Sequence, residues 1–568
     1  MYTLDKARKE ALVSLKKTLG KKFLVTPDML TAAPKPELGD LSFGCFALAK
    51  GQGRNPVEVA TELAAHLGLS TLISKISSAG PYVNFHFNEA NFASLVLHDV
   101  LKMKKRYGQG TAGKGKKVLV DFAQPNTHKE FHVGHIRNAL LGQSIINVLR
   151  ASGYETIGAA YIGDIGAHVA KALWGYEKWY KDIKIEKSER AKVLGEIYTK
   201  ATQYVADHEE AKLEIAEVQR KLEAEEEPWL GLWKETREWS LASFREIFGE
   251  LGVKPDEWYF ESQVEKPGKE LVKKMLVEGI AKKSEGATIV DLEDEKLGAF
   301  LVLKTDGSSL YATKDLALAF KKDEDYHADR QIFVIDVRQS LYMKQLFVTL
   351  RRLGFTPDLV HIGYELVNLP EGTMSSRTGN VAKYEDLRDA MRAKLTEETV
   401  SRHADWRAKK VKLNAEALTQ AGIAFTMLRQ DPGKIITFDM AEAMSVDGFT
   451  GPYILYTIAR IYSLEAKADM PPIMLGEQLT HPLEAQLLRL VAEFPSVVGK
   501  VAASYQVSMI AQKTYDLAKV FAEYYHQVRV LDDVNHDRKG ARLALLAVVR
   551  QTLINSCDLL GMQTVKEM

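Results

Sequence analysis

Cysteine is almost absent from this sequence. Among its 568 residues there are two cysteines, Cys45 and Cys557, which stand near opposite ends of the chain. Two thiols exclude a disulfide framework and a zinc site built from cysteines alone. The sequence is therefore typical of a protein that folds in a reducing compartment, and we expect it to act in the cytoplasm.

Net charge and long apolar runs are lacking as well. Lys and Arg together number 76 and Asp and Glu 75, so the formal net charge is +1. Such a chain has no long-range field that would gather nucleic acid or acidic lipid, and any polyanion must bind at local patches. No run reaches the ~18 apolar residues of a membrane span, and the first residues lack the apolar core of a signal peptide. We therefore expect no membrane partner.

What the sequence does contain predicts a folded, multidomain α/β protein. Apolar residues make up 46% of the chain and charged residues 27%, which is usual for folded soluble proteins. Residues 1–107 predict an N-terminal α/β module. Residues 116–390 predict a Rossmann-type domain with a parallel sheet, because strand patterns such as KVLVDFA and QIFVID each precede a helical stretch. An acidic helical insertion is expected at about 180–290, and residues 391–568 predict an all-α domain.

The most informative segment runs from a predicted strand into a predicted helix that opens with His132, Val133, Gly134 and His135. A helix N-terminus presents free N–H groups and partial positive charge, which suits an anion such as phosphate. Two imidazoles three residues apart share a face there and can donate hydrogen bonds, while Gly134 would let a flat base approach the backbone. Structural histidines and a zinc pair are the alternatives, but the metalloprotease spacing with its glutamate is missing. We expect no resident metal.

A second candidate site is the segment KTDGSSLYATKDLALAF. Tyr311 and Asp315 are four residues apart at a predicted helix start, so they can share one face. A carboxylate paired with a guanidinium is a strong bidentate interaction, and Asp315 could supply the carboxylate. The alternative is that Asp315 only stabilises the dipole of the first helical turn.

These segments resemble one enzyme family. The residues from His132 to His135 resemble the HIGH motif of class I aminoacyl-tRNA synthetases, and Pro125, Asn126 and Lys129 before them resemble arginyl-tRNA synthetases in particular. The later segment GTMSSRTGN is similar to the KMSKS motif, although Thr373 and Ser376 occupy its two lysine positions.

The resemblance implies roles for further residues. Lys129 would compensate for the missing loop lysines, with Arg377 as a second cation. The further residues that would bind ATP are Gly134, Met374, Ser375 and Ser376. Tyr311 and Asp315 match the family's Tyr-x-x-x-Asp signature for binding the substrate arginine. By the same resemblance Asp121 and Asn126 would hold the α-amino and carboxylate groups of the amino acid and Gln339 would help with the guanidinium, although a longer acid is common at position 121.

The ends of the chain also resemble this family. PELGDLSFGCFALAK is similar to its N-terminal tRNA-binding module, and DGFTGPYILYTIARIYSL to its helical anticodon-binding domain. In the latter, Tyr453, Tyr456, Arg460 and Tyr462 mix aromatic and basic groups as base stacking requires, although tyrosines at helical spacing more often belong to a core. The segment GDIGAH matches too, and lining of the adenosine or amino-acid pocket is our interpretation of it.

The implied function is that of a monomeric ligase. L-Arginine and ATP, with Mg²⁺, would give arginyl-adenylate, and the arginyl group would pass to the 3′ end of tRNA(Arg). One alternative is a HIGH-type nucleotidyltransferase or a synthetase for another amino acid. The other is a non-catalytic tRNA-binding paralogue, for which the depleted KMSKS-like loop is the support.

Overall fold

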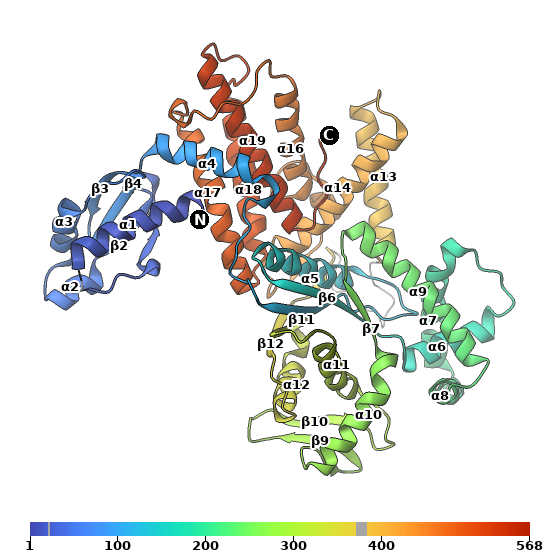
Figure 1. Ribbon diagram of the computed structural model, residues 1–568. Helices are drawn as coiled ribbons and strands as arrows, with labels where there is room; N and C mark the ends of the chain where they lie inside the picture. The colour runs from blue at the N-terminus through green and yellow to red at the C-terminus, as the bar shows by residue number, and fades with distance from the viewer. Residues whose placement is uncertain (21–22, 371–382) are drawn as a thin grey trace.

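The computed structural model describes residues 1–20, 23–370 and 383–568, and a parallel β-sheet lies at its centre (Figure 1). Its five strands have the order β12-β11-β5-β6-β7, and every neighbouring pair is parallel. The strands are β5 (Lys117–Phe122), β6 (Glu155–Ile162), β7 (Glu257–Phe260), β11 (Arg330–Asp336) and β12 (Asp358–Tyr364). Runs such as VLVDF are buried because helices cover both faces of the sheet. The predicted α/β fold with a parallel sheet is confirmed.

The strand order places a switch point between β5 and β11, where successive connections turn to opposite sides. Ligands of open α/β sheets bind outside the carboxyl ends of the strands at such a point. One face of the sheet is covered by α5 (Val133–Ala151), and the other by α11 (Tyr311–Tyr326) and α12 (Ser340–Arg352) (Figure 1).

Two excursions leave the sheet, where one insertion was expected. The stretch at about 180–290 contains β7, which pairs with β6 in the central sheet, so the expected single insertion is corrected. The first excursion is helical and has its own core, and the second carries a three-stranded antiparallel sheet. Their elements are α6 (Ala167–Trp179), α7 (Arg190–Asp207), α8 (Glu210–Glu223) and α9 (Trp229–Leu251), then α10 (Glu261–Val277), β8 (Lys282–Ser284), β9 (Ala287–Leu292) and β10 (Gly298–Leu303).

The N-terminal part is a small α/β unit with an antiparallel sheet of order β1-β2-β4-β3. Asn55 caps a helix whose first residue is Pro56, as its sequence predicts. The elements are α1 (Thr3–Leu19), β1 (Leu30–Ala32), β2 (Leu41–Gly44), α2 (Phe46–Gln52), α3 (Pro56–His66), β3 (Ile73–Ala79), β4 (Tyr82–Phe87) and α4 (Glu89–Met103).

The C-terminal part is a bundle of helices. They are α13 (Tyr384–Arg402), α14 (Ala408–Leu428), α15 (Met440–Met444), α16 (Gly451–Ala466), α17 (Pro482–Ser504), α18 (Ser508–Gln527) and α19 (His536–Leu559). A two-residue strand, β14 (Ile436–Thr437), pairs with β13 (Val367–Asn368) that follows the central sheet. Residues 391–568 therefore contain helices, their connections and this short strand, which was not predicted from the sequence.

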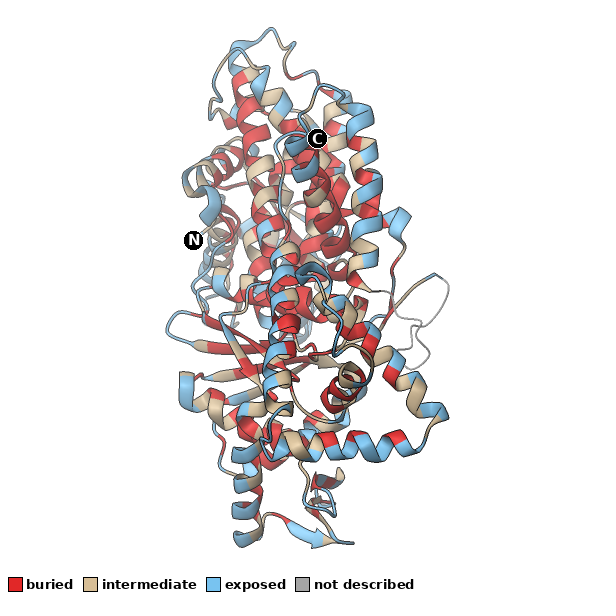
Figure 2. Ribbon diagram, turned by 90° about the vertical axis from the view of Figure 1, so that its right-hand side faces the viewer, coloured by how far each residue is buried: buried red, intermediate tan, exposed pale blue. Residues whose placement is uncertain are grey.

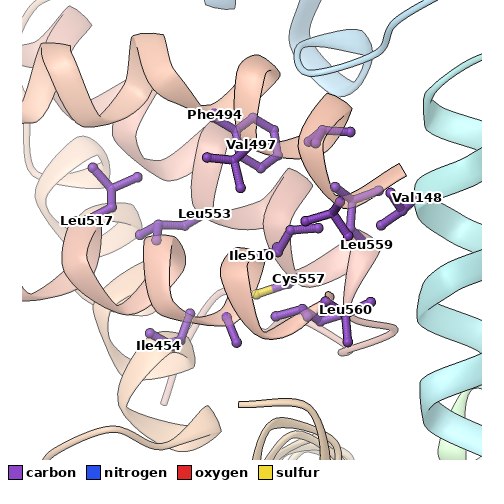
Figure 3. Packing of buried hydrophobic residues seen from close by; sticks show 14 of the residues in the cluster. Val148, Ile454, Phe494, Val497, Ile510, Leu517, Leu553, Cys557, Leu559 and Leu560 are labelled. Atoms are coloured by element: carbon purple, nitrogen blue, oxygen red, sulfur yellow. The ribbon is translucent and has the colours of Figure 1, made fainter. Parts of the chain in front are cut away.

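The HIGH-bearing helix α5 packs into the C-terminal bundle. Buried residues, red in Figure 2, line the inner faces of the C-terminal helices and the central sheet. Val148 of α5 lies beside Leu559 and Leu560 at the end of α19 (Figure 3), and the Ser144 hydroxyl donates to the Leu559 carbonyl at 2.9 Å. One core therefore joins α5 to the helical bundle. None of the described helices is long and apolar enough to span a membrane.

Candidate active site

The HIGH segment forms the junction between β5 and α5. His132 is the N-cap of α5, and its ring stacks on that of His135 with the centroids 3.7 Å apart. The His132 N–H donates to Nδ1 of His135 at 3.2 Å, which leaves the proton of neutral His135 on Nε2. A Cβ on Gly134 would lie 3.1 Å from Cε1 of His132. In this structure Gly134 therefore makes room for an imidazole, where the sequence analysis predicted a base.

Both imidazoles are held neutral. Burial lowers the pKa of His132 to about 4, and the Lys129 ammonium adds to the shift. The pKa of His135 lies well below its ordinary value, because of burial and the neighbouring His132 and Lys129. Each neutral ring keeps one N–H to donate. Positive charge at this end of the site therefore comes from the helix N-terminus and Lys129.

Lys129 stands close to the two histidines and faces the first excursion. Its ammonium lies 5.1 Å from the ring centroid of Tyr198 in α7, close enough for a cation–π interaction. Within residues 1–20, 23–370 and 383–568 no carboxylate forms an ion pair with it. The ammonium is therefore not neutralised by the residues described around it.

The KMSKS-like residues Thr373, Met374, Ser375, Ser376 and Arg377 lie outside the described residues. The chain that follows them lies beside the HIGH segment. Lys383 forms a β-bridge with His132 and an ion pair with Glu130 at 2.6 Å. Lys383 and the start of α13 therefore lie directly beside the HIGH motif.

The residues that are predicted to bind arginine, Tyr311 and Asp315, lie at the start of α11. Tyr311 is its first residue and is 60% exposed. Asp315 is partly exposed, and its Oδ2 accepts a hydrogen bond from the Tyr342 hydroxyl at 2.5 Å. Surrounding protein atoms raise the pKa of Asp315 to about 6, and the nearby Asp121 carboxylate adds to the rise. Asp315 thus has no cation paired with it in the described structure, which is the state expected of a carboxylate that receives a cationic ligand.

Two further carboxylates surround this position. Glu261, the first residue of α10, pairs with Lys314 at 2.5 Å, and burial raises its pKa to about 7. Asp121 on β5 pairs with the fully buried Lys322. Three carboxyl groups thus face two ammonium groups, and one added cation would balance the cluster. Asp121 and Asp315 were predicted from the sequence. Glu261 and Lys322 were not, because the order of the strands brings these residues together.

Asn126 and Gln339 lie at the carboxyl edge of the same sheet. Asn126 forms a parallel β-bridge with Gly163, just beyond β6. Gln339 ends a short 3₁₀ helix (Val337–Gln339) after β11 and is exposed. It precedes α12, which carries the Tyr342 that contacts Asp315. The residues predicted from the sequence and lying within the described chain therefore share one edge of the sheet.

The Asp164 carboxylate accepts hydrogen bonds from other residues of the protein. Its carboxylate accepts from Arg237 Nε and the Ser262 hydroxyl, both at 2.7 Å, and from the Ser262 N–H at 2.9 Å. The side chain is fully buried. Its neighbours Ile165 and Gly166 line a cavity of about 610 Å³ that also reaches Lys314. Asp164 thus fastens α9 and α10 to the end of β6, and lining of the adenosine or amino-acid pocket by the GDIGAH segment stays a prediction.

Comparisons with known proteins extend over all three parts of the chain. The family profile described as "tRNA synthetases class I (R), catalytic domain" matches residues 96–431, "DALR anticodon binding domain" matches 454–568 and "Arginyl tRNA synthetase N terminal domain" matches 5–87. A curated arginine–tRNA ligase of Bdellovibrio bacteriovorus is 38% identical over 95% of this chain and 94% of its own length. Another, from Halothermothrix orenii, is 32% identical over 95% of both chains.

The chain belongs to the arginyl-tRNA synthetase family.

Solved structures share the fold of this arginyl-tRNA synthetase family member. The Thermus thermophilus arginyl-tRNA synthetase superposes with a TM-score of 0.82 over 99% of this chain and 100% of its own, at 23% identity. The Plasmodium falciparum arginyl-tRNA synthetase has a TM-score of 0.79 over 100% of both chains, at 20% identity. These likenesses extend over the N-terminal module, the parallel-sheet domain and the helical bundle together.

The aromatic residues of α16 pack within this family member's helical bundle. The Arg460 guanidinium lies 4.5 Å from the ring centroid of Tyr456 and 4.6 Å from that of Tyr525. The ring of Tyr453 lies 5.7 Å from that of Tyr515. The contacts of Arg460 with Tyr525 and of Tyr453 with Tyr515 join α16 to α18, and these tyrosines are partly buried. Within the described residues, no group of three or more His, Cys, Asp or Glu is arranged to hold a metal ion.

Proposed function

We propose that this chain activates L-arginine with ATP, which gives arginyl-adenylate and pyrophosphate, and then transfers the arginyl group to the 3′ end of tRNA(Arg). The observation that carries the proposal is that an anion site and a cation site lie at the same edge of the central sheet. An anion site lies at the N-terminus of α5, and a cation site with three carboxyl groups and two lysines lies beside α11. A substrate with a guanidinium and a carboxylate can reach both at once.

The anion site is proposed to bind ATP. His132 and His135 donate hydrogen bonds to phosphate oxygens, Gly134 gives access to the backbone, and Lys129 supplies positive charge. The KMSKS-like loop adds Met374, Ser375, Ser376 and Arg377. Mg²⁺ enters with ATP as part of the substrate, since triphosphate oxygens are ligands that it prefers. Charge that develops on the α-phosphate and pyrophosphate is stabilised by donors already in place, so no nucleophilic side chain is required.

The cation site is proposed to bind arginine. Asp315 and Glu261 hold the guanidinium, with Tyr311 and Gln339 beside it. Asp121 and Asn126 hold the α-amino and carboxylate groups. This orientation points the arginine carboxylate towards the α5 N-terminus, where it attacks the α-phosphate of ATP.

The remaining parts of the chain are proposed to bind tRNA(Arg). We assign the tRNA-binding role to the N-terminal module, residues 1–107, and the anticodon to the helical part, residues 391–568. The enzyme is proposed to act as a monomer in the cytoplasm, and the catalytic part to span residues 116–390.

Arginine-dependent ATP–pyrophosphate exchange tests the proposal directly. Each standard amino acid is assayed with and without tRNA(Arg), and transfer to tRNA is measured with labelled amino acid. We expect exchange and charging with arginine alone. Comparable activity with lysine or glutamine would contradict the arginine assignment. Binding of tRNA without exchange or charging under either condition would favour the non-catalytic paralogue.

A further inference from the structure

Lys322 is a fully buried charged residue of the cation site, and the reaction described above assigns it no contact with a substrate. It lies on α11 with 0% of its side chain exposed. Its ammonium donates to Oδ2 of Asp121, which is itself only 2% exposed. The other carboxylate oxygen of Asp121 accepts from Gln124 Nε2 at 2.7 Å. A carboxylate has about four acceptor positions, so Asp121 keeps capacity for one more donor.

The side chain of Lys322 crosses the face of the central sheet. Its ammonium lies 5.7 Å from the ring centroid of Tyr161 on β6, 5.6 Å from that of Tyr259 on β7 and 5.7 Å from that of Phe333 on β11. Aromatic faces can stabilise an ammonium that has lost its water. Because these rings and Asp121 come from four strands, the position of the ammonium is set by the sheet.

Lys322 also has a fixed relation to the guanidinium end of the proposed pocket. It follows Asp315 by seven residues, which is two helical turns on the same face and about 10.5 Å along the axis. Helix α11 therefore carries Asp315, at the guanidinium end of the proposed arginine pocket. Through the ion pair of Lys322, the same helix is also bound to Asp121, at the α-amino end. Separating a buried ion pair leaves an uncompensated charge, so α11 cannot slide along the sheet without a large cost.

We infer that Lys322 is a positioning residue which sets the distance between the two halves of the arginine pocket, and hence the length of side chain that the enzyme accepts. The inference rests on the proposed function, since it takes Asp315 and Asp121 as the two ends of bound arginine. The ion pair fixes α11 in register with β5. The fixed distance between Asp315 and Asp121 thereby selects amino acids by the number of methylenes between the α-carbon and the guanidinium.

Substitution of Lys322 by Met tests the inference, because Met keeps the length and apolar packing of the side chain but removes the charge. Exchange is measured with L-arginine, with L-homoarginine and with the analogue one methylene shorter. One methylene is ordinarily worth ~10–200-fold in kcat/KM. We expect Lys322→Met to reduce this discrimination to ~3-fold or less and to raise KM for arginine by ~30-fold or more. KM for ATP is expected to stay within about twofold, since the α5 anion site is untouched.

Lys321→Met is the matched control. Lys321 is the neighbouring residue on α11, and it makes a partly exposed ion pair with Asp325 at 3.3 Å. We expect the discrimination and both KM values of this variant to equal those of the wild type.

The double variant Asp121→Asn/Lys322→Met covers the case in which Lys322→Met does not fold. It leaves no unpaired buried charge, so it should unfold at nearly the wild-type temperature. We still expect it to discriminate poorly among the three amino acids. Wild-type discrimination in either folded variant, with only the unfolding temperature lowered, would make Lys322 a purely structural residue and overturn the inference. Lack of arginine-dependent exchange in the wild type is a separate result, and it would overturn the proposed function and this inference together.

Discussion

At the scale of single residues, the two ends of the site hold their charge differently. The histidines at the α5 N-terminus are neutral, because burial lowers the pKa of His132 to about 4 and that of His135 well below its ordinary value. The carboxyl groups beside α11 have raised pKa values, about 6 for Asp315 and about 7 for Glu261. The histidines thus offer hydrogen bonds without charge of their own, and the second end has three carboxyl groups but two ammonium groups, so that Asp315 has no paired cation among the described residues.

Removal of the Asp315 charge should weaken arginine binding. Asp315→Asn keeps the shape of the side chain but cannot pair with a guanidinium, so we expect a loss of ~2–4 kcal/mol in arginine affinity. Exchange kinetics at varied arginine concentration measure it, with Glu324→Gln, an exposed position on the same helix, as the control. An unchanged KM and kcat would mean that Asp315 only stabilises the dipole of α11.

The raised pKa of Asp315 predicts a pH dependence. A carboxyl whose pKa is raised to about 6 takes up a proton as the pH falls through 6. The protonated form carries no charge for the guanidinium, so kcat/KM for arginine should fall as the pH drops below about 6. This inflection should disappear or move in Asp315→Asn. If it is the same in the variant, another group is responsible for it.

The two histidines should act mainly on the transition state. Replacement of either His132 or His135 by Ala removes one preorganised donor, and we expect kcat for adenylate formation to fall by ~10²–10³. Single-turnover measurements of adenylate formation separate this from ATP binding. A weaker ATP affinity with unchanged kcat would restrict the histidines to ground-state binding.

At the scale of elements, much of the site is predictable because it depends on local pattern. The helix after the HIGH motif begins at Val133 and the arginine-signature helix begins at Tyr311, both as the sequence predicts. Glu261 and Lys322 were missed because their role depends on the pairing of β7 with β6 and on α11 crossing the sheet. An acid directly after a short aromatic strand, as in WYFES, is the local signal that could have pointed to Glu261.

The KMSKS-like segment GTMSSRTGN bears on this scale, because Thr373 and Ser376 stand at the two positions where the motif has lysines. If Lys129 supplies the missing cation, Lys129→Ala should strongly reduce adenylate formation while KM for arginine stays unchanged. Ser376→Lys in that background should restore part of the rate, since an ammonium near the same phosphates can replace another. A double-mutant cycle measures the coupling. Equal effects of Ser376→Lys with and without Lys129 would contradict the compensation.

At the scale of the whole molecule, the boundaries of the three parts are less sharp than the sequence predicts. Helix α13 begins at Tyr384, before the expected start of the helical part at 391. Arg137 of α5 is almost fully buried and donates to the carbonyls of Asp431 and Pro432 at 3.2 and 3.0 Å. Periodicity cannot reveal such contacts, because the residues that meet are far apart in the chain. The helix that carries the HIGH motif is therefore held by the segment that follows α14, which precedes the residues 454–568 that match the anticodon-binding domain.

This shared core predicts that the catalytic and helical parts lose stability together. Val148 is 1% exposed between α5 and α19, so Val148→Asp buries a charge without a partner. We expect a loss of ~4 kcal/mol, which lowers the unfolding temperature by about 8 °C. Hydrogen exchange should speed up in α5 and in α19 alike, because each helix loses the packing of the other. Val534→Asp, at a position that is 98% exposed, is the control and should change neither measurement. Faster exchange confined to α5, with α19 as protected as before, would show that the bundle folds independently of the catalytic helix.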